Sequence, residues 1–168
     1  VMITSNNRMT FSELLQRPAC FLGLGFGSGL APKAPGTFGT LAAVPIYLLL
    51  KDLPLAVYIA VVLAAFIAGI WICQKSAEWL GQSDPSAVVW DEIVGYLITM
   101  AAAPDGWEWI VLGFVLFRFF DILKPWPINL ADKAIHGGLG IMVDDVIAGL
   151  FALVCLQWLY HVFPTISW

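Results

Sequence analysis

Long runs of uncharged, apolar residues are the feature that most limits how this sequence can fold. The clearest run extends from Leu53 to Cys73, and a second extends from Val146 to Phe163. A run of about 20 apolar residues is long enough to cross the hydrocarbon core of a bilayer as a helix. Of the 168 residues, 60% are hydrophobic and 12% are charged, whereas soluble proteins have about 45–50% and 25%. The sequence therefore predicts an all-α integral membrane protein.

We expect about five membrane helices packed as a single membrane-embedded domain over residues 1–168. Residues 1–20 carry charges and no continuous apolar core, so we interpret them as a cytoplasmic N-terminal segment and not as a signal peptide. The first membrane helix lies in the run between Lys33 and Lys51, where Pro35, Gly36, Gly39 and Pro45 interrupt the apolar pattern. We expect this helix to begin near Thr40 and to be short or only partly inserted.

Two further helices carry charged residues inside or near their apolar spans. Ser83 and Asp84 are good N-cap residues and Pro85 suits a first helical position, which predicts a helix from Pro85 to Ala103. A fourth helix is predicted from about Trp107 to Leu123, because prolines follow it closely.

The distribution of lysine and arginine predicts the orientation of the bundle. Cytoplasmic loops hold an excess of these residues. With five crossings and a cytoplasmic N-terminus, only Lys51 lies outside. The cytoplasmic side then holds Arg8, Arg17, Lys33, Lys75, Arg118, Lys124 and Lys133.

Five carboxylates are predicted at the cytoplasmic ends of the last three helices. Each is costly at membrane depth, by about 2.5–3.5 kcal/mol on insertion scales. Any one of them could simply lie at the water interface or pair with a nearby cation. Together they would repel one another unless a cation is bound, and oxygen ligands without a His or Cys cluster favour Mg²⁺ or Mn²⁺. We predict that metal ligands and one general base come from Asp91, Glu92, Asp121, Asp144 and Asp145.

A glycine-rich segment and several basic residues favour a phosphate ligand. The segment GLGFGSGLAPKAPGTFGT, residues 23–40, can expose backbone N–H groups ahead of a helix, although it contains no nucleotide P-loop. Arg118 and Asp121 are three residues apart and share a helical face. The candidate phosphate-binding residues are Lys33, Thr37, Thr40, Arg118, Lys124 and His136. Tyr96 could hydrogen-bond to Glu92 or serve only in packing.

Other classes of function fit the sequence less well. A net charge of −4 argues against a nucleic-acid partner. The three cysteines are far apart and read as buried apolar residues. The competing hypothesis is a small ion or proton transporter or a channel subunit, since intramembrane carboxylates also mark ion paths. Such a path would need charged residues across the bilayer, whereas here they are predicted on one side.

Four motifs, in order, resemble those of the phosphatidylglycerophosphatase A family of bacterial inner-membrane enzymes. They are GFGSGLAPKAPGTFGT, VVWDEIVGY, FRFFDILKPWPI and HGGLGIMVDDVIAG, and the resemblance runs from about residue 20 to the end. It implies hydrolysis, dependent on Mg²⁺, of phosphatidylglycerophosphate to phosphatidylglycerol and inorganic phosphate. It also implies a multi-pass protein of the inner membrane, with the lipid substrate bound at the cytoplasmic face. Head-group selectivity and oligomeric state stay open.

Overall fold

The computed structural model describes residues 11–163, apart from the side chains of residues 11 and 131–133. Every regular element within this part of the chain is a helix, as predicted. The elements are α1 (Phe11–Leu15), α2 (Pro18–Gly23), the 3₁₀ helix η1 (Gly25–Leu30), α3 (Pro35–Leu50), α4 (Leu55–Leu80), α5 (Trp90–Thr99), α6 (Trp107–Leu123), α7 (Ile128–Ala134) and α8 (Gly137–Val162).

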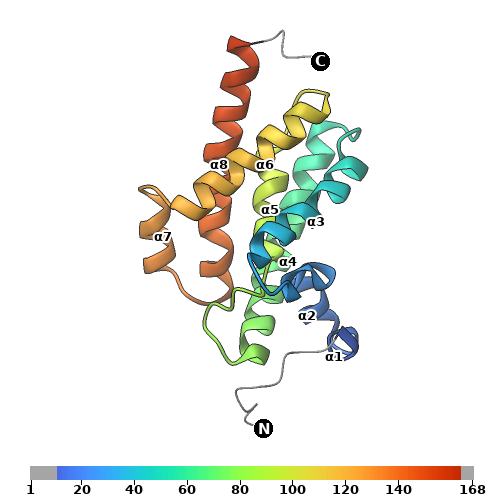
Figure 1. The fold of residues 1–168 in the computed structure, drawn as a ribbon, viewed down its shortest axis with the longest axis vertical. Coiled ribbons are helices and arrows are strands. Elements are labelled where there is room, and N and C mark those ends of the chain that lie inside the picture. Colours follow the sequence, from blue (N-terminus) through green and yellow to red (C-terminus); the bar gives the residue numbers. More distant parts are fainter. Residues whose placement is uncertain (1–10, 164–168) are drawn as a thin grey trace.

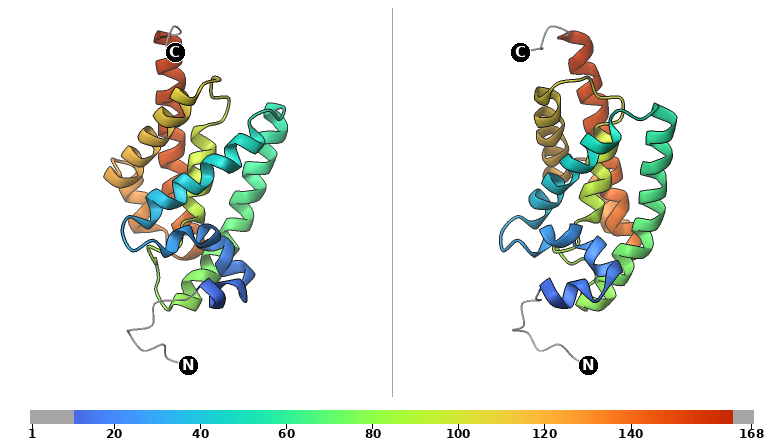
Figure 2. Two further views of the ribbon diagram at one scale, coloured as in Figure 1. Left: turned by 45° about the vertical axis from the view of Figure 1, so that its right-hand side comes forward. Right: turned by 90° about the vertical axis from the view of Figure 1, so that its right-hand side faces the viewer.

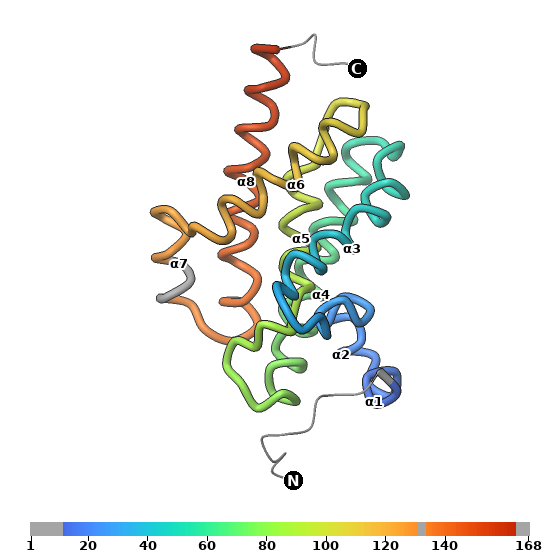
Figure 3. The backbone as a smooth tube through the Cα atoms, viewed as in Figure 1, coloured from blue at the N-terminus to red at the C-terminus, as the bar shows by residue number. Residues whose placement is uncertain are grey.

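The longer helices form an elongated bundle (Figure 1). Going along the chain, α3, α5 and α8 run in one direction along the bundle, while α4 and α6 run back (Figure 2). Helix α5 is central, because it packs against α3, α4, α6 and α8. The short helices α1 and α2 lie at the end of the bundle where α3, α5 and α8 begin (Figure 3). This arrangement brings the starts of three helices and the ends of two others to the same end of the molecule.

Two helices, α4 and α8, are long and apolar enough to cross a membrane. In α4 only 22% of the most apolar stretch is buried inside the protein. A core helix of a soluble protein would be mostly buried. Most of the apolar surface of α4 is instead exposed on the outside of the bundle. Large apolar side chains elsewhere are also exposed, such as Leu49, Trp126 and Val154. These features support association with a membrane.

Helices α3 and α4 differ at their boundaries from the prediction. Helix α3 begins at Pro35 and not near Thr40, because proline fits the first turn of a helix, where its missing N–H is not needed. The same helix continues through Pro45. Helix α4 extends to Leu80, seven residues past the predicted end. It stops at Gly81, whose positive φ of 68° forms a left-handed C-cap.

The predicted helix from Pro85 to Ala103 is wrong at both ends. Helix α5 has only 10 residues, Trp90–Thr99. The segment before it turns back on itself, with the N–H of Val88 bonded to the carbonyl of Pro85 at 2.9 Å. Asp84 therefore does not cap this helix, and Val89 occupies the N-cap position. The strong local cap signal was overridden by tertiary contacts of this segment.

The last two long helices are closer to the prediction. Helix α6 has the predicted bounds, Trp107–Leu123. Helix α8 begins at Gly137, nine residues before the predicted start. Apolar periodicity could not locate that start, because three glycines and two aspartates interrupt the apolar residues of this segment. Asp144 and Asp145 consequently lie about two turns inside α8.

Candidate active site

A cavity of about 330 Å³ opens where α3, α5 and α8 begin and α6 ends. The first residues of α3, the turn at residues 83–88 and the α7–α8 junction complete its wall. Its titratable lining residues are Asp84, Asp91, Glu92, Arg118, Asp121, Lys124, His136, Asp144 and Asp145. All five predicted carboxylates thus reach one cavity, although they come from three helices.

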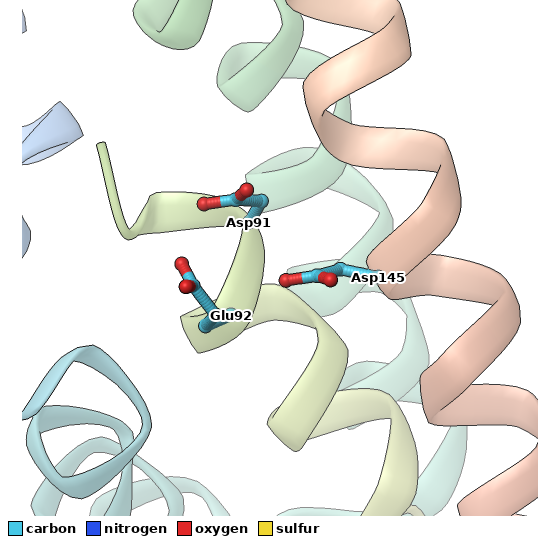
Figure 4. Close-up of side chains that lie close together, drawn as sticks. All are labelled: Asp91, Glu92 and Asp145. Carbon is cyan, nitrogen blue, oxygen red and sulfur yellow. The ribbon is translucent and has the colours of Figure 1, made fainter. Parts of the chain in front are cut away.

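Three of these carboxylates form a tight cluster. Asp91, Glu92 and Asp145 each offer one oxygen, and these oxygens lie within 4.8 Å of one another. Figure 4 shows the three carboxylate groups facing a common space, two from α5 and one from α8. One oxygen on each, Asp91 Oδ1, Glu92 Oε2 and Asp145 Oδ2, is buried without a hydrogen-bond partner among the described residues. Because buried carboxylates without partners are costly, this arrangement suits a bound cation.

Close packing between α5 and α8 brings this cluster together. A Cβ atom on Gly149 would lie 2.5 Å from the carbonyl oxygen of Gly95, and one on Gly95 would lie 2.9 Å from the carbonyl oxygen of Asp145. Only glycine allows the two backbones to approach this closely. Gly95 follows Glu92 by three residues and Gly149 follows Asp145 by four. The crossing point therefore lies one helical turn from the carboxylates and sets their separation.

The start of α5 is also fixed from two sides. The Val89 N–H donates to the carbonyl of Gly23 at 2.8 Å, which ties α5 to α2. The indole Nε1 of Trp90 donates to the carbonyl of Ala65 on α4 at 3.1 Å. Asp91 and Glu92 lie in the first turn of α5, where the helix dipole favours negative charge.

Two cations face the carboxylates across the cavity. Arg118 is in ion-pair contact with Asp121, and its Nη1 is 3.8 Å from Glu92 Oε1. Its Nε atom is buried without a hydrogen-bond partner in the described part of the chain. Lys124, the C-cap residue of α6, donates to Asp144 Oδ2 at 2.5 Å. The cavity therefore offers both acidic oxygen ligands and cationic donors.

The structure separates the predicted phosphate-binding residues into two groups. Arg118, Lys124 and His136 line the cavity, whereas Lys33, Thr37 and Thr40 are not among its lining residues. Lys33 is exposed. The buried hydroxyl of Thr40 donates to the carbonyl of Gly36 at 2.9 Å, a bond within its own helix. From the glycine-rich segment, Gly36 reaches the cavity instead.

Gly36 packs against the charged groups of the site, and sequence reasoning missed this role. A Cβ atom on Gly36 would clash with Glu92 Oε1 and approach Arg118 Nη1 to 3.0 Å. Asp84, interpreted from the sequence as a helix cap, also lines the cavity. Tyr96 does not reach Glu92, because its hydroxyl donates to the carbonyl of Ile110 at 3.1 Å. The pairing of Gly95 with Gly149 could have been suspected from their similar offsets after the acidic residues.

The fold and the cavity together define a helical protein with apolar outer surfaces and an acidic site at one end of its bundle. An oxygen-only acidic cluster next to an arginine and a lysine is suited to a cation and a phosphate group.

Comparison with known proteins identifies the family. Residues 21–160 match the family model for phosphatidylglycerophosphatase A, and the chain belongs to this family. It is 42% identical to phosphatidylglycerophosphatase A of Escherichia coli over 151 residues, covering 89% of this chain and 88% of the relative. It is 43% identical to the protein of the same name from Haemophilus influenzae over 154 residues, covering 90% and 94%.

A third relative carries a different name. A Bacteroides thetaiotaomicron protein, provisionally named a phosphatidylinositol-3-phosphatase, is 40% identical over 153 residues, covering 84% of this chain and 95% of the relative. All three names describe phosphatases of phospholipid head groups. No solved structure matches the chain.

Proposed function

We propose that the cavity hydrolyses the terminal phosphomonoester of phosphatidylglycerophosphate, with Mg²⁺, to give phosphatidylglycerol and inorganic phosphate. Family membership supports the lipid phosphatase activity in phospholipid synthesis. The observation that carries the site assignment is the cluster of buried carboxylate oxygens without partners, beside two cations in one cavity.

The residues present fit a divalent cation. Asp91, Glu92 and Asp145 would hold it, because each has a buried oxygen that lacks a partner among the described residues. Six carboxylates and only two Lys or Arg side chains line the cavity, so a phosphate dianion would otherwise be repelled. Bound Mg²⁺ would reverse this local field, lower the pKa of a water molecule and stabilise the leaving oxygen.

The protein's own groups bind and orient the lipid phosphate. The guanidinium of Arg118 and the ammonium of Lys124 donate charge-assisted hydrogen bonds to phosphate oxygens. A carboxylate oxygen of the acidic cluster accepts a proton from the attacking water. As the water oxygen bonds to phosphorus, the bond to the glycerol oxygen breaks, and that oxygen takes up the proton that the carboxylate accepted and leaves as the hydroxyl of phosphatidylglycerol.

We further propose five crossings, by α3, α4, α5, α6 and α8, with the N-terminus in the cytoplasm. The directions of these helices support an odd number of passes (Figure 2). Helix α5, with 10 residues, is about 15 Å long and is surrounded by longer helices, so in this pass the helix itself covers only part of the bilayer thickness. Arg8 and Lys133 lie outside the residues whose side chains are described. The other basic residues at the cavity end are Arg17, Lys33, Lys75, Arg118 and Lys124.

The chemistry of the substrate agrees with this placement. A lipid phosphomonoester has its head group at the membrane surface, and its acyl chains can remain among exposed apolar residues. Ile122 lines the cavity and is 65% exposed, which would let the cavity open toward lipid. The transporter hypothesis gains no support, because the carboxylates gather in one cavity at one end of the bundle.

Phosphate release by the protein in detergent, with synthetic phosphatidylglycerophosphate, tests the proposal. We expect release with Mg²⁺ and loss of release with excess EDTA, restored when Mg²⁺ is added back. The matched variants are Asp145→Asn in the cluster and Glu78→Gln on the surface, where Glu78 pairs with Lys75 at 2.8 Å. Release that is insensitive to EDTA, or that survives in Asp145→Asn, would contradict the metal assignment.

A further inference from the structure

We propose that Asp121 and Asp144 are positioning residues that hold Arg118 and Lys124 for the phosphate, and that they are not metal ligands. The five carboxylates of the cavity then fall into two groups with different roles. Asp91, Glu92 and Asp145 hold the cation, and the other two hold the phosphate-binding cations. This inference rests on the proposed function, and it assigns different roles to two adjacent aspartates.

The first observation is how the two groups differ in their partners. The metal-site cluster is defined by oxygens from Asp91, Glu92 and Asp145 within 4.8 Å of one another, and it includes neither Asp121 nor Asp144. Asp121 is in contact with the guanidinium of Arg118. Asp144 Oδ2 accepts from Lys124 Nζ at 2.5 Å. An oxygen already engaged by a buried cation is a poor ligand for a metal ion, because the metal would have to displace that partner.

The second observation is the helical geometry that separates Asp144 from Asp145. Consecutive residues of an α-helix project about 100° apart. Asp145 faces the acidic residues of α5 and also lies beside Asp121 of α6, while Asp144 faces Lys124 at the end of α6. Both are almost completely buried, at 3% and 7% exposure, so neither side chain can turn to water without leaving the cavity wall. The helical backbone therefore directs Asp145 toward the acidic cluster and Asp144 toward Lys124.

The third observation is the donor capacity that remains on Arg118. Arginine has five N–H donors, so Arg118 can keep its contact with Asp121 while donating to a phosphate oxygen. Arg118 Nε is buried without a hydrogen-bond partner among the described residues, although the side chain contacts Asp121. Both ion pairs are mostly buried, with side-chain exposures of 15% and 12% for Arg118 and Asp121, and 29% and 9% for Lys124 and Asp144. In such surroundings the aspartate fixes where the cation lies.

Metal binding and phosphate binding can be measured separately to test this division. We would titrate the purified full chain in detergent with Mn²⁺ alone, followed by electron paramagnetic resonance. Inorganic phosphate affinity would be measured by calorimetry, and KM and kcat with the lipid phosphomonoester. The variants are Asp144→Asn, Asp121→Asn and Asp145→Asn, with Glu78→Gln as the surface ion-pair control.

We expect Asp144→Asn and Asp121→Asn to bind Mn²⁺ as the unchanged protein does. Their KM for the lipid and their dissociation constant for phosphate should rise by about tenfold, the effect of weakening one hydrogen bond to a charged group. Asp145→Asn should lose Mn²⁺ binding. Loss of Mn²⁺ binding in Asp144→Asn or Asp121→Asn would overturn the proposal, as would unchanged phosphate affinity in both.

A double-mutant cycle distinguishes positioning from a general structural role. If Asp144 acts through Lys124, Asp144→Asn should have little further effect on KM in a Lys124→Gln background. Asp144→Glu retains the carboxylate and should recover part of the phosphate affinity. This variant also keeps the test possible if Asp144→Asn does not fold. Additive effects of the two substitutions would count against the proposal. Failure of the unchanged protein to release phosphate would reject the proposed function, while the Mn²⁺ titrations would still test the division of the carboxylates.

Discussion

Gly95 on α5 and Gly149 on α8 face each other so closely that a Cβ atom on Gly149 would lie 2.5 Å from the carbonyl oxygen of Gly95. This contact decides the distance between the acidic residues of α5 and Asp145 of α8. The carboxylate cluster is therefore a product of helix packing and not of any local motif.

Substituting alanine for Gly149 should push α5 and α8 apart. We expect a loss of stability of about 1–3 kcal/mol, as for other overpacked cores, together with a marked fall in phosphate release. Thermal unfolding in detergent and the release assay would measure the two effects. Leu150→Ala is the matched control, because the adjacent Leu150 is 47% exposed. This substitution should change neither the stability nor the phosphate release strongly. Full activity in Gly149→Ala would show that the crossing does not set the site.

Asp145→Asn should reduce phosphate release by at least about a hundredfold, because it removes a charged ligand from the proposed metal site. The asparagine side chain has nearly the same shape, so the helices should still pack. Release would be assayed over a range of Mg²⁺ concentrations, and size-exclusion chromatography would report folding. If Asp145→Asn released phosphate as fast as the unchanged protein at the same Mg²⁺ concentration, Asp145 would not be a ligand of the proposed metal site.

Arg118→Lys should impair the enzyme although it retains the positive charge. Lysine cannot reproduce the planar set of donors that reaches Asp121, lies near Glu92 and leaves Nε for a ligand. We expect KM for the lipid to rise by about tenfold or more. Lys75→Arg, at a pair on the surface whose side chains are about half exposed, should leave KM unchanged. Equal KM values for the two variants would argue against a specific role for the guanidinium.

Gln74 links α4 to the start of α8, and its removal should destabilise the protein more than it alters catalysis. Its Oε1 accepts from the Gly138 N–H at 2.7 Å, which satisfies a donor in the first turn of α8. Gln74→Ala should lower the free energy of unfolding by about 1 kcal/mol. Denaturation of this variant beside Gln82→Ala, at an exposed position, would measure the difference. An identical stability for the two variants would mean that the contact is unimportant.

The proposed orientation can be tested by labelling single cysteines. In a chain whose three natural cysteines are replaced by serine, Lys51→Cys should react with a membrane-impermeant thiol reagent added outside intact cells. Gln82→Cys should react only after the membrane is opened, because Gln82 follows α4 at the cavity end. The reverse pattern would invert the topology, and equal labelling of both would contradict the predicted crossings.

Sequence reasoning succeeded where the physical signal was local. Apolar runs located α4, α6 and most of α8, because a helix long enough to cross a bilayer needs an uninterrupted run of apolar residues, and such a run can be read directly from the sequence. It failed at the start of α5, where Ser83, Asp84 and Pro85 form a good cap signal. The Val89 N–H bonds instead to Gly23, a contact between residues distant in the chain that no local pattern could reveal.

The sequence by itself determined that the chain is helical, apolar and rich in carboxylates near helix ends, and its motifs determined the family. Only the tertiary structure decided which carboxylates meet. Asp144 and Asp145 are neighbours in sequence, yet one faces Lys124 and the other faces Asp91 and Glu92. A side chain's partner depends on where other helices cross, and that crossing depends on distant glycines such as Gly95 and Gly149, whose missing side chains let two backbones touch.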